Sequence, residues 1–313
     1  MIKLLIIIVP VFNEEESLQY FHEQLSQVIS SIEKYNWEIL YVNDGSSDNS
    51  LGIIDNLYNN DKRVSYINLS RNFGKESAML AGFDYMHGDA AIIMDADLQD
   101  PPTLIPELLH YWEEGYEDIY AKRRTRGKES WLRRNFTILF YNILDRSTNF
   151  EILKNVGDFR LLDCKCIEAL RQLRESERYT KGLFCWIGFK KKDILFDREN
   201  RQHGKSHWNF ISLLALAMEG ITSFTTMPLR LATLMGFLTG LGAIVYLIWT
   251  LIKVMVWGDP VAGFPTLICV ILFLGSVQLI CMGILGEYIA RIFNESKRRP
   301  NYLVSNYFKS EIK

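Results

Sequence analysis

The sequence has almost no net charge, because 35 lysine and arginine residues face 37 aspartate and glutamate residues, a formal charge of −2. A balance this close to zero provides no overall field to attract a polyanion, so we expect no nucleic-acid partner. The five cysteines also lack a framework: Cys164 and Cys166 lie close together, but no second pair follows at zinc spacing. We therefore expect reduced thiols and a cytosol-facing protein.

The first residues, MIKLLIIIVPVFNEEE, lack the small-residue cleavage site of a signal peptide. Their apolar run is short, contains Pro10 and leads into three glutamates, which favours a buried first strand. Up to about residue 206 the pattern is that of a soluble α/β protein.

Charge is nearly absent from two later segments. Leu231–Val256 contains only Lys253, and Gly263–Leu285 contains no charged residue. Each is long enough to cross the ~30 Å hydrocarbon layer as a helix, which these lengths favour over two buried core helices. Because Arg230 and the segment RIFNESKRR flank them with positive charge, we expect a hairpin of two spans with both termini cytoplasmic.

The first half of the chain alternates strand and helix patterns. A helix is expected from near Ser17, and another carries small residues at Ala78, Ala81 and Gly82. Repeated units of this kind predict an α/β fold with a doubly wound, mostly parallel sheet. The clusters NEEE, NDGSSD and DADLQD each follow a strand, so we expect them to converge on the sheet edge where such folds bind ligands. The expected strands are LLIIIV, WEILYV, VSYINL and AAIIM.

Two aspartates follow the fourth expected strand, one residue apart. On an extended segment Asp95 and Asp97 share a face, and two such carboxylates repel unless a cation neutralises them. Mg²⁺ or Mn²⁺ suits these oxygen ligands, and Mg²⁺ usually completes its shell with substrate phosphates. The pattern therefore predicts a divalent metal held by Asp95 and Asp97, with Gln99 beside them, and a phosphate-bearing substrate.

Six motifs in this order resemble the family 2 glycosyltransferases of the GT-A fold: VPVFNEEES, VNDGSSDNS, NFGKESAMLAGF, MDADLQDPP, VGDFRLLD and RQHGKSHW. The closer resemblance is to polyprenyl-phosphate sugar transferases, which include dolichol-phosphate mannose synthases. ITSFTTMPLR, LGEYIARIFNESKRRPNY and the two expected spans are similar to the bactoprenol glucosyltransferase branch.

This resemblance implies roles for individual residues. Asp158 would be the catalytic carboxylate, and Arg201 and Ser206 would lie on a loop that closes over the substrates. The family usually has lysine after that serine, but His207 stands here, which makes a phosphate contact pH-dependent. The remaining residues implied to bind the nucleotide sugar are Pro10, Phe12, Glu14, Val42, Asp44, Asp95, Ala96, Asp97, Gln99 and Arg123.

The implied reaction is an inverting transfer from a nucleoside-diphosphate sugar to polyprenyl phosphate on the cytoplasmic leaflet. Glucose from UDP-glucose is the first choice by branch resemblance, whereas mannose, N-acetylglucosamine and an aminoarabinose derivative remain open. A phosphate monoester has a second pKa near ~6 and carries little proton at neutral pH. We therefore expect Asp158 to position the acceptor, or an arginine such as Arg201, rather than to act as a base.

The expected organisation has four parts: a glycosyltransferase domain over residues 1–206, interfacial amphipathic helices over 207–230, two membrane helices over 231–290 and a cytoplasmic tail over 291–313. The interfacial segment is apolar but contains Glu219, Gly220 and Pro228, so it is too interrupted to span. We expect a multi-pass inner-membrane protein, with a homotetramer as the weaker expectation.

Other functions fit less well. A processive polysaccharide synthase would carry a Q-x-x-R-W segment and more spans, and a nucleotidyltransferase would need a glycine-rich loop in place of VFNEEE. An inactive membrane scaffold that partners a flippase is the non-enzymatic alternative. Asp95, Asp97 and Asp158 argue against it, and loss of metal-dependent donor binding would favour it.

In isolation, single residues have ordinary explanations. Asp44-Gly45 can form a plain turn, and Asp158 can pair with Arg160.

Overall fold

An eight-stranded sheet lies at the centre of the part of the chain that the computed structural model describes, which comprises residues 2–124, 153, 156–176, 178–196, 227–257 and 263–311. The strand order is β7-β5-β6-β4-β1-β2-β3-β8. The strands are β1 (Leu4–Val11), β2 (Asn36–Asn43), β3 (Val64–Leu69), β4 (Ala90–Ile93), β5 (Asp118–Arg123), β6 (Val156–Asp163), β7 (Lys191–Phe196) and β8 (Val304–Phe308).

The four strands expected from the sequence, β1 to β4, form a continuous parallel block. β1 is apolar at successive positions because both of its faces are covered. Leu5, Ile7 and Val9 pack into the core on one face of the sheet, whereas Ile6 and Ile8 pack into the core on the other. This is the arrangement that a continuous apolar run predicts.

Helices cover both faces. α1 (Leu18–Ser30), α2 (Ser50–Asn60) and α4 (Ile105–Glu113), which follows the short 3₁₀ helix η1 (Pro102–Leu104), pack on one face. The helices on the opposite face are α3 (Lys75–Tyr85), α6 (Cys164–Gln172) and α7 (Thr180–Trp186). The expected doubly wound α/β architecture is confirmed.

The small residues of α3 bring this helix close to β1. A Cβ atom at Gly82 would lie 2.4 Å from Cγ2 of Ile8, so only glycine allows this approach. Ala78 and Ala81 are fully buried beside it. α3 is therefore held tightly against the sheet, and its first residue, Lys75, is placed by that packing.

Antiparallel strands extend the block on both sides, so the sheet is mixed. β6 pairs antiparallel with β4 and β5, and β8 pairs antiparallel with β3. β8 lies within residues 291–313, the expected cytoplasmic tail, where the sequence pattern predicts no strand. In β8, Phe308 stacks on Tyr66 of β3 with ring centroids 4.6 Å apart.

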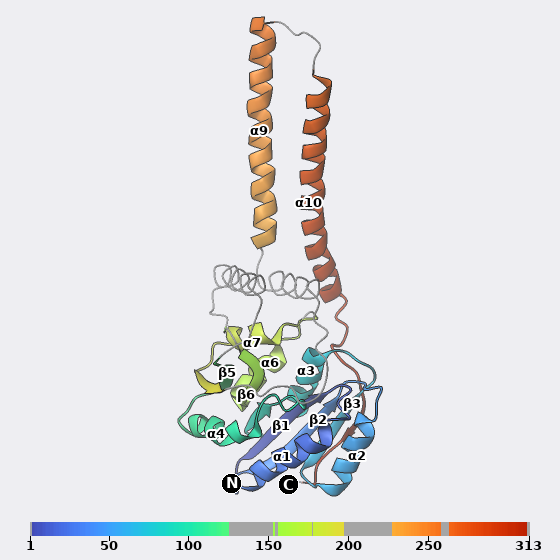
Figure 1. Ribbon diagram of the computed structural model, residues 1–313, viewed down its shortest axis with the longest axis vertical. Helices are drawn as coiled ribbons and strands as arrows, with labels where there is room; N and C mark the ends of the chain where they lie inside the picture. Colours follow the sequence, from blue (N-terminus) through green and yellow to red (C-terminus); the bar gives the residue numbers. More distant parts are fainter. Residues whose placement is uncertain are drawn as a thin grey trace.

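Two long helices, α9 (Met227–Trp257) and α10 (Phe264–Ser296), stand away from the sheet domain (Figure 1). Stretches of both, Pro228–Tyr246 and Phe273–Ser296, are long and apolar enough to cross a membrane, and 0% and 6% of their most apolar windows are buried. α9 includes Met227 to Arg230 and α10 continues past residue 290, so the helices extend beyond the expected spans. Residues 207–226 of the expected interfacial segment lie outside the described part.

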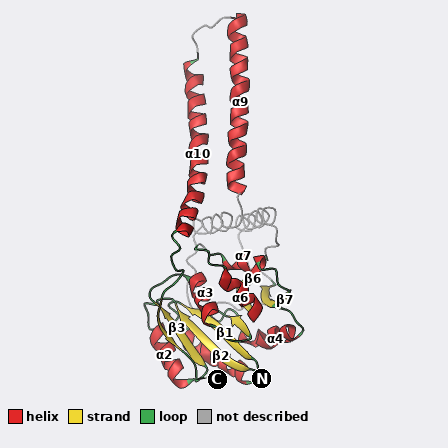
Figure 2. Cartoon of the chain, turned by 180° about the vertical axis from the view of Figure 1, so that it is seen from behind, coloured by secondary structure: helices red, strands yellow, loops and turns green. Residues whose placement is uncertain are grey.

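The end of α10 is tied to the sheet domain. Glu295 accepts a hydrogen bond from the backbone N–H of Ser176 (3.0 Å), and Tyr302 donates its hydroxyl to Asp84 at the end of α3 (2.6 Å). In both views, α3 and α7 lie on the side of the domain nearest to the long helices (Figures 1 and 2).

Candidate active site

Three residues from three elements meet at the carboxyl ends of the central strands. Lys75 Nζ lies 2.6 Å from Oδ1 and 2.8 Å from Oδ2 of Asp95, which follows β4. The same Nζ donates to Oδ2 of Asp158 on β6 at 2.6 Å. One ammonium group thus joins the first aspartate of the expected metal pair to the expected catalytic carboxylate.

The sheet register explains why the two aspartates meet. β4 and β6 run antiparallel with Ile93 opposite Arg160. Asp95 follows the end of β4 by two residues and Asp158 precedes Arg160 by two, so the same register continued past Ile93 sets Asp95 opposite Asp158. The two motifs are about sixty residues apart in sequence, a separation that only sheet pairing closes.

The Asp158 side chain is only 10% exposed. Burial alone would raise its pKa, but the positive charges of Lys75 and Lys181, together with the hydrogen bond from Lys75, lower the pKa to about 2. Its Oδ1 atom is buried without a hydrogen-bond partner among the described residues. Asp158 is therefore ionised and has one oxygen available to a substrate group.

Lys75 is the residue that the sequence analysis missed, although it lies within the quoted motif NFGKESAMLAGF. Burial would lower its pKa, but the charges of Asp95 and Asp158 raise the pKa above its ordinary value. The signal was available: Lys75 begins a helix after a parallel strand, the position where functional groups of such folds gather.

Asp44 shapes the loop before Lys75. Its Oδ1 accepts from the backbone N–H of Phe73 (2.7 Å) and its Oδ2 from that of Gly74 (2.9 Å). Burial, partly offset by these hydrogen bonds, raises the pKa of Asp44. Gly45 is more than a plain turn residue: its φ is +64°, and a Cβ there would lie 2.4 Å from the carbonyl carbon of Arg71. Both Asp44 oxygens are thus engaged with backbone, and the nucleotide contact expected for Asp44 stays a prediction.

The second aspartate of the pair belongs to a tight turn. Asp97 Oδ1 accepts from the backbone N–H of Gln99 at 3.1 Å, and the Gln99 side chain is buried. Leu98 between them has a φ of 57°, and Ala96 is buried. A branched side chain in this left-handed conformation is strained, and such strain is concentrated at functional sites.

The chemistry of these side chains fits a divalent cation that takes few protein ligands. Among the described residues, no group of three or more histidine, cysteine or acidic side chains is arranged to hold a metal. Asp95 and Asp97 offer two carboxylates, the number that Mg²⁺ uses when phosphate and water oxygens complete its shell.

The other expected site residues take several positions. Pro10 of β1 and Val42 of β2 are register partners near the carboxyl ends of their strands. Phe12 is 46% exposed, and Glu14 Oε2 accepts from the Ser17 hydroxyl at 2.9 Å. Arg123 ends β5, with its Nε buried and unpaired among the described residues. Arg201, Ser206 and His207 lie outside the described residues.

Arg160 does not pair with Asp158, contrary to the ordinary explanation considered for that aspartate. Its Nη1 lies 3.1 Å from both carboxylate oxygens of Asp118 on β5, and its guanidinium stacks 3.7 Å from the ring centroid of Phe184. This buried pair supports β6 from the side and leaves Asp158 to Lys75.

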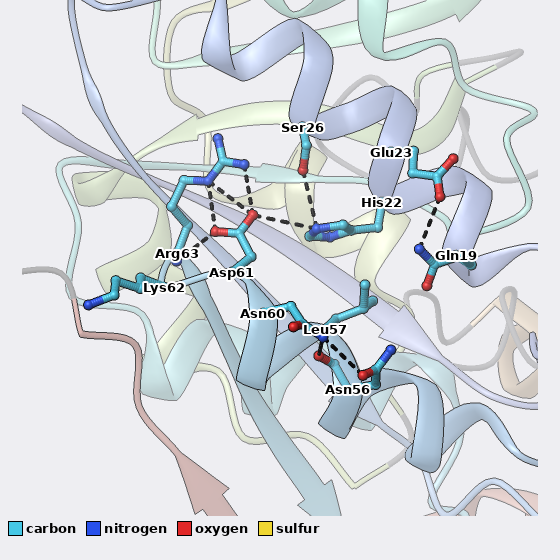
Figure 3. Close-up of a pocket in the computed structure, with 10 residues that line it drawn as sticks. All are labelled: Gln19, His22, Glu23, Ser26, Asn56, Leu57, Asn60, Asp61, Lys62 and Arg63. Carbon is cyan, nitrogen blue, oxygen red and sulfur yellow. Dashed lines mark hydrogen bonds and ion pairs between the residues drawn. The ribbon is translucent and has the colours of Figure 1, made fainter.

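A surface hollow of 740 Å³ lies elsewhere, between α1 and α2 near the start of β3 (Figure 3). There His22 contacts Tyr41 (3.0 Å) and Asp61 (3.5 Å), and Asp61 pairs with Arg63. Because Arg63 precedes β3, this hollow lies at the amino ends of the strands, away from Asp95. We assign this network to packing of α1 against the loop.

Comparison with known proteins places the chain in a family. The family model described as "Glycosyl transferase family 2" matches residues 6–171, which include Lys75, Asp95 and Asp158, and the model "GtrB C-terminal hairpin" matches residues 227–292. The chain belongs to glycosyl transferase family 2, and its sheet domain has the GT-A fold of that family.

Relatives are similar over nearly their whole length. An uncharacterized glycosyltransferase of Synechocystis sp. is 44% identical over 96% of this chain and 94% of its own. The bactoprenol glucosyl transferase of Shigella phage SfV is 41% identical over 96% of this chain and 97% of its own. A solved structure, the mannosyl-3-phosphoglycerate synthase of Rubrobacter xylanophilus, is 15% identical with a TM-score of 0.47, over 69% of this chain and 71% of that one.

Proposed function

We propose that this glycosyltransferase moves a sugar from a nucleoside diphosphate to polyprenyl phosphate, with glucose from UDP-glucose and undecaprenyl phosphate as the first choices. The observation that carries the proposal is the meeting of Asp95 and Asp158 at Lys75, in a chain that also has two exposed apolar helices. The relatives named bactoprenol glucosyl transferase support this choice of sugar and acceptor.

Asp95 and Asp97, with Gln99 beside them, would hold Mg²⁺ or Mn²⁺. When bound, this ion supplies a Lewis acid for the charge that grows on the leaving diphosphate. Asp158 and Lys75 lie next to the expected position of the ion. There the acceptor phosphate oxygen would attack the anomeric carbon from the face opposite to the leaving diphosphate and invert its configuration.

The environment of Asp158 favours a positioning role over a base role. A carboxylate with a pKa of about 2 accepts a proton poorly. A phosphate monoester with a second pKa near ~6 is a weaker acid than protonated Asp158, so proton transfer to this carboxylate is unfavourable. A dianionic acceptor has no such proton to give, so the charge on Asp158 serves to hold Lys75 and orient the substrates.

The Asp158→Asn variant tests this role through the pH profile of the transferase rate. We expect a loss of about a hundredfold or more that is similar at acid and alkaline pH, because no proton transfer is removed. Asp193→Asn is the control. It removes a carboxylate on β7 that pairs with Lys122 at 3.3 Å, and it should leave the rate unchanged. Recovery of most of the activity in alkali would support the base role and contradict ours.

The C-terminal strand supports the proposed topology, with both termini cytoplasmic. Residues before α9 and residues after α10 join the same sheet, so a membrane crossed by both helices is crossed an even number of times. Arg230 lies in the first turn of α9, and Lys297, Arg298 and Arg299 follow α10, so positive charge gathers on that side, as the positive-inside rule requires of a cytoplasmic face. Assembly as a homotetramer stays a prediction.

The decisive experiment incubates membranes that contain the protein with labelled sugar nucleotides, undecaprenyl phosphate and Mg²⁺ or Mn²⁺. We expect label from UDP-glucose in the lipid fraction, with loss of transfer in chelator. Label from a mannose, N-acetylglucosamine or aminoarabinose donor would change the sugar and keep the reaction. No lipid label from any donor, under conditions where a bactoprenol glucosyl transferase works, would overturn the proposal.

A further inference from the structure

Lys75 occupies the position next to Asp95 where a metal ion is expected. Its ammonium group has three N–H donors, and three carboxylate oxygens lie within reach: both oxygens of Asp95, at 2.6 and 2.8 Å, and Oδ2 of Asp158, at 2.6 Å. The position that a metal ion would take against Asp95 is therefore shared with a protein cation.

The ammonium group is placed by the fold. Asp44 binds the backbone N–H groups of Phe73 and Gly74, which directly precede Lys75. Gly74 has a φ of +94°, a conformation that L side chains rarely adopt. Gly82 then fixes α3 against β1. These contacts hold the start of α3 and aim one lysine at both aspartates.

The two ends of this bridge differ in exposure. The Asp95 side chain is 31% exposed and that of Asp158 is 10% exposed. A divalent cation binds a carboxylate oxygen at about 2.0–2.1 Å, closer than any ammonium contact, and repels a second cation on the same group. A metal ion can thus displace the Lys75 ammonium group from Asp95, whereas the contact of Lys75 with buried Asp158 is kept.

We propose that Lys75 is a placeholder cation: it neutralises Asp95 in the free protein, yields Asp95 to the divalent ion that arrives with the donor, and remains on Asp158 facing the acceptor phosphate. This inference deepens the proposed function and rests on it for the identity of the acceptor. Lys75 then acts as a positioning residue that links occupation of the donor site to the charge presented to the acceptor. Asp158 Oδ1, buried and unpaired among the described residues, is free to receive a substrate donor in that state.

The test measures Mn²⁺ binding to the full-length protein in detergent, without nucleotide, by electron paramagnetic resonance. We expect Lys75→Met to bind Mn²⁺ about tenfold more tightly than the wild type, because the competing cation is gone. Lys181→Met is the matched control, since Lys181 lowers the pKa of Asp158 through its charge, whereas no hydrogen bond or ion pair joins it to Asp95 in the described part of the chain. It should change the Mn²⁺ affinity less than about threefold. Unchanged or weaker Mn²⁺ binding by Lys75→Met would overturn the inference.

A second readout separates positioning from a structural role. With saturating metal and donor, Lys75→Met should raise the KM for polyprenyl phosphate about tenfold, and Lys75→Arg should recover part of that loss. A KM for the acceptor that stays at the wild-type value would contradict the acceptor-facing part of the inference. Where Lys75→Met does not fold, Lys75→Gln serves in both measurements.

The failures are distinguishable because Mn²⁺ binding needs no turnover. A wild type that transfers no sugar would remove the proposed function and leave the exchange between lysine and metal standing. An active wild type whose Mn²⁺ affinity is insensitive to Lys75 would keep the function and remove the inference.

Discussion

The sheet domain and the helical hairpin use the same apolar residue types in opposite ways. Leu5 and Ile8 in β1 are fully buried, whereas Leu279 and Ile292 in α10 are 72% and 68% exposed. In the domain, apolar side chains cover one another and leave a polar edge for chemistry. In the hairpin most of them stay exposed within the described part of the chain, which is the property of a surface solvated by lipid.

The buried charges show the same contrast. Arg160 and Asp118 are 1% and 0% exposed and form a buried ion pair at 3.1 Å. Lys62 and Glu311, which join the domain to the end of β8, pair at 2.9 Å in full contact with water. A single substitution in the buried pair is therefore expected to destabilise the domain strongly. A substitution in the exposed pair is not.

The largest effect is expected for Arg160→Met. It leaves Asp118 buried and unpaired, which costs about 3–5 kcal/mol and lowers the thermal unfolding midpoint. The double variant with Asp118→Leu should recover most of the loss, and Lys62→Met should show no measurable change. A fall in stability no larger for Arg160→Met than for Lys62→Met would break the contrast.

The next effect tests the hairpin through Leu279→Arg. An arginine near the centre of a membrane helix disfavours insertion by about 2.5–3.5 kcal/mol. We expect a smaller membrane-integrated fraction after carbonate extraction. Leu303→Arg is the control, because Leu303 is also exposed (55%) but precedes β8, outside both helices. Equal extraction of the two variants would mean that α10 does not contact lipid.

The smallest effect compares two glycines. Gly82→Ala brings a Cβ to 2.4 Å from Ile8 and should cost about 1–3 kcal/mol through overpacking, as measured by thermal unfolding. Gly236→Ala in α9 meets nothing within 4 Å and should be neutral. A loss at Gly236 as large as that at Gly82 would mean that Gly236 packs against something outside the described part of the chain, and packing against another copy would agree with the prediction of an oligomer.

Much of the fold could be predicted because the first strands carry a local signal. Continuous apolar runs predicted β1 to β4, and the small residues noted in the sequence of α3 lie where that helix packs closely against β1. β8 could not be predicted in this way: VSNYF is short and partly polar, and its partner β3 lies more than two hundred residues earlier. Pairing at that distance is decided by tertiary structure rather than by propensity.

The candidate site was predicted in its acidic half. Asp95 stood out as a charge after an apolar strand and Asp158 was implied by the family resemblance, and the antiparallel register of β4 and β6 brings them together. Lys75 did not stand out, because a lysine at the start of a helix is an ordinary surface residue by sequence. The loop geometry set by Asp44 and Gly74, which places Lys75, depends on tertiary contacts, so the start of a helix after a parallel strand was the one signal for Lys75 in the sequence.

The position of β8 has a consequence for folding of the protein during its synthesis on the ribosome. β3 is the outer strand of the parallel block until residues 304–308 are made, and both hairpin helices are made before them. Throughout synthesis of the hairpin the nascent sheet therefore keeps an open edge, the kind of edge that recruits foreign strands. Residues 304–308 close it once the hairpin has been made.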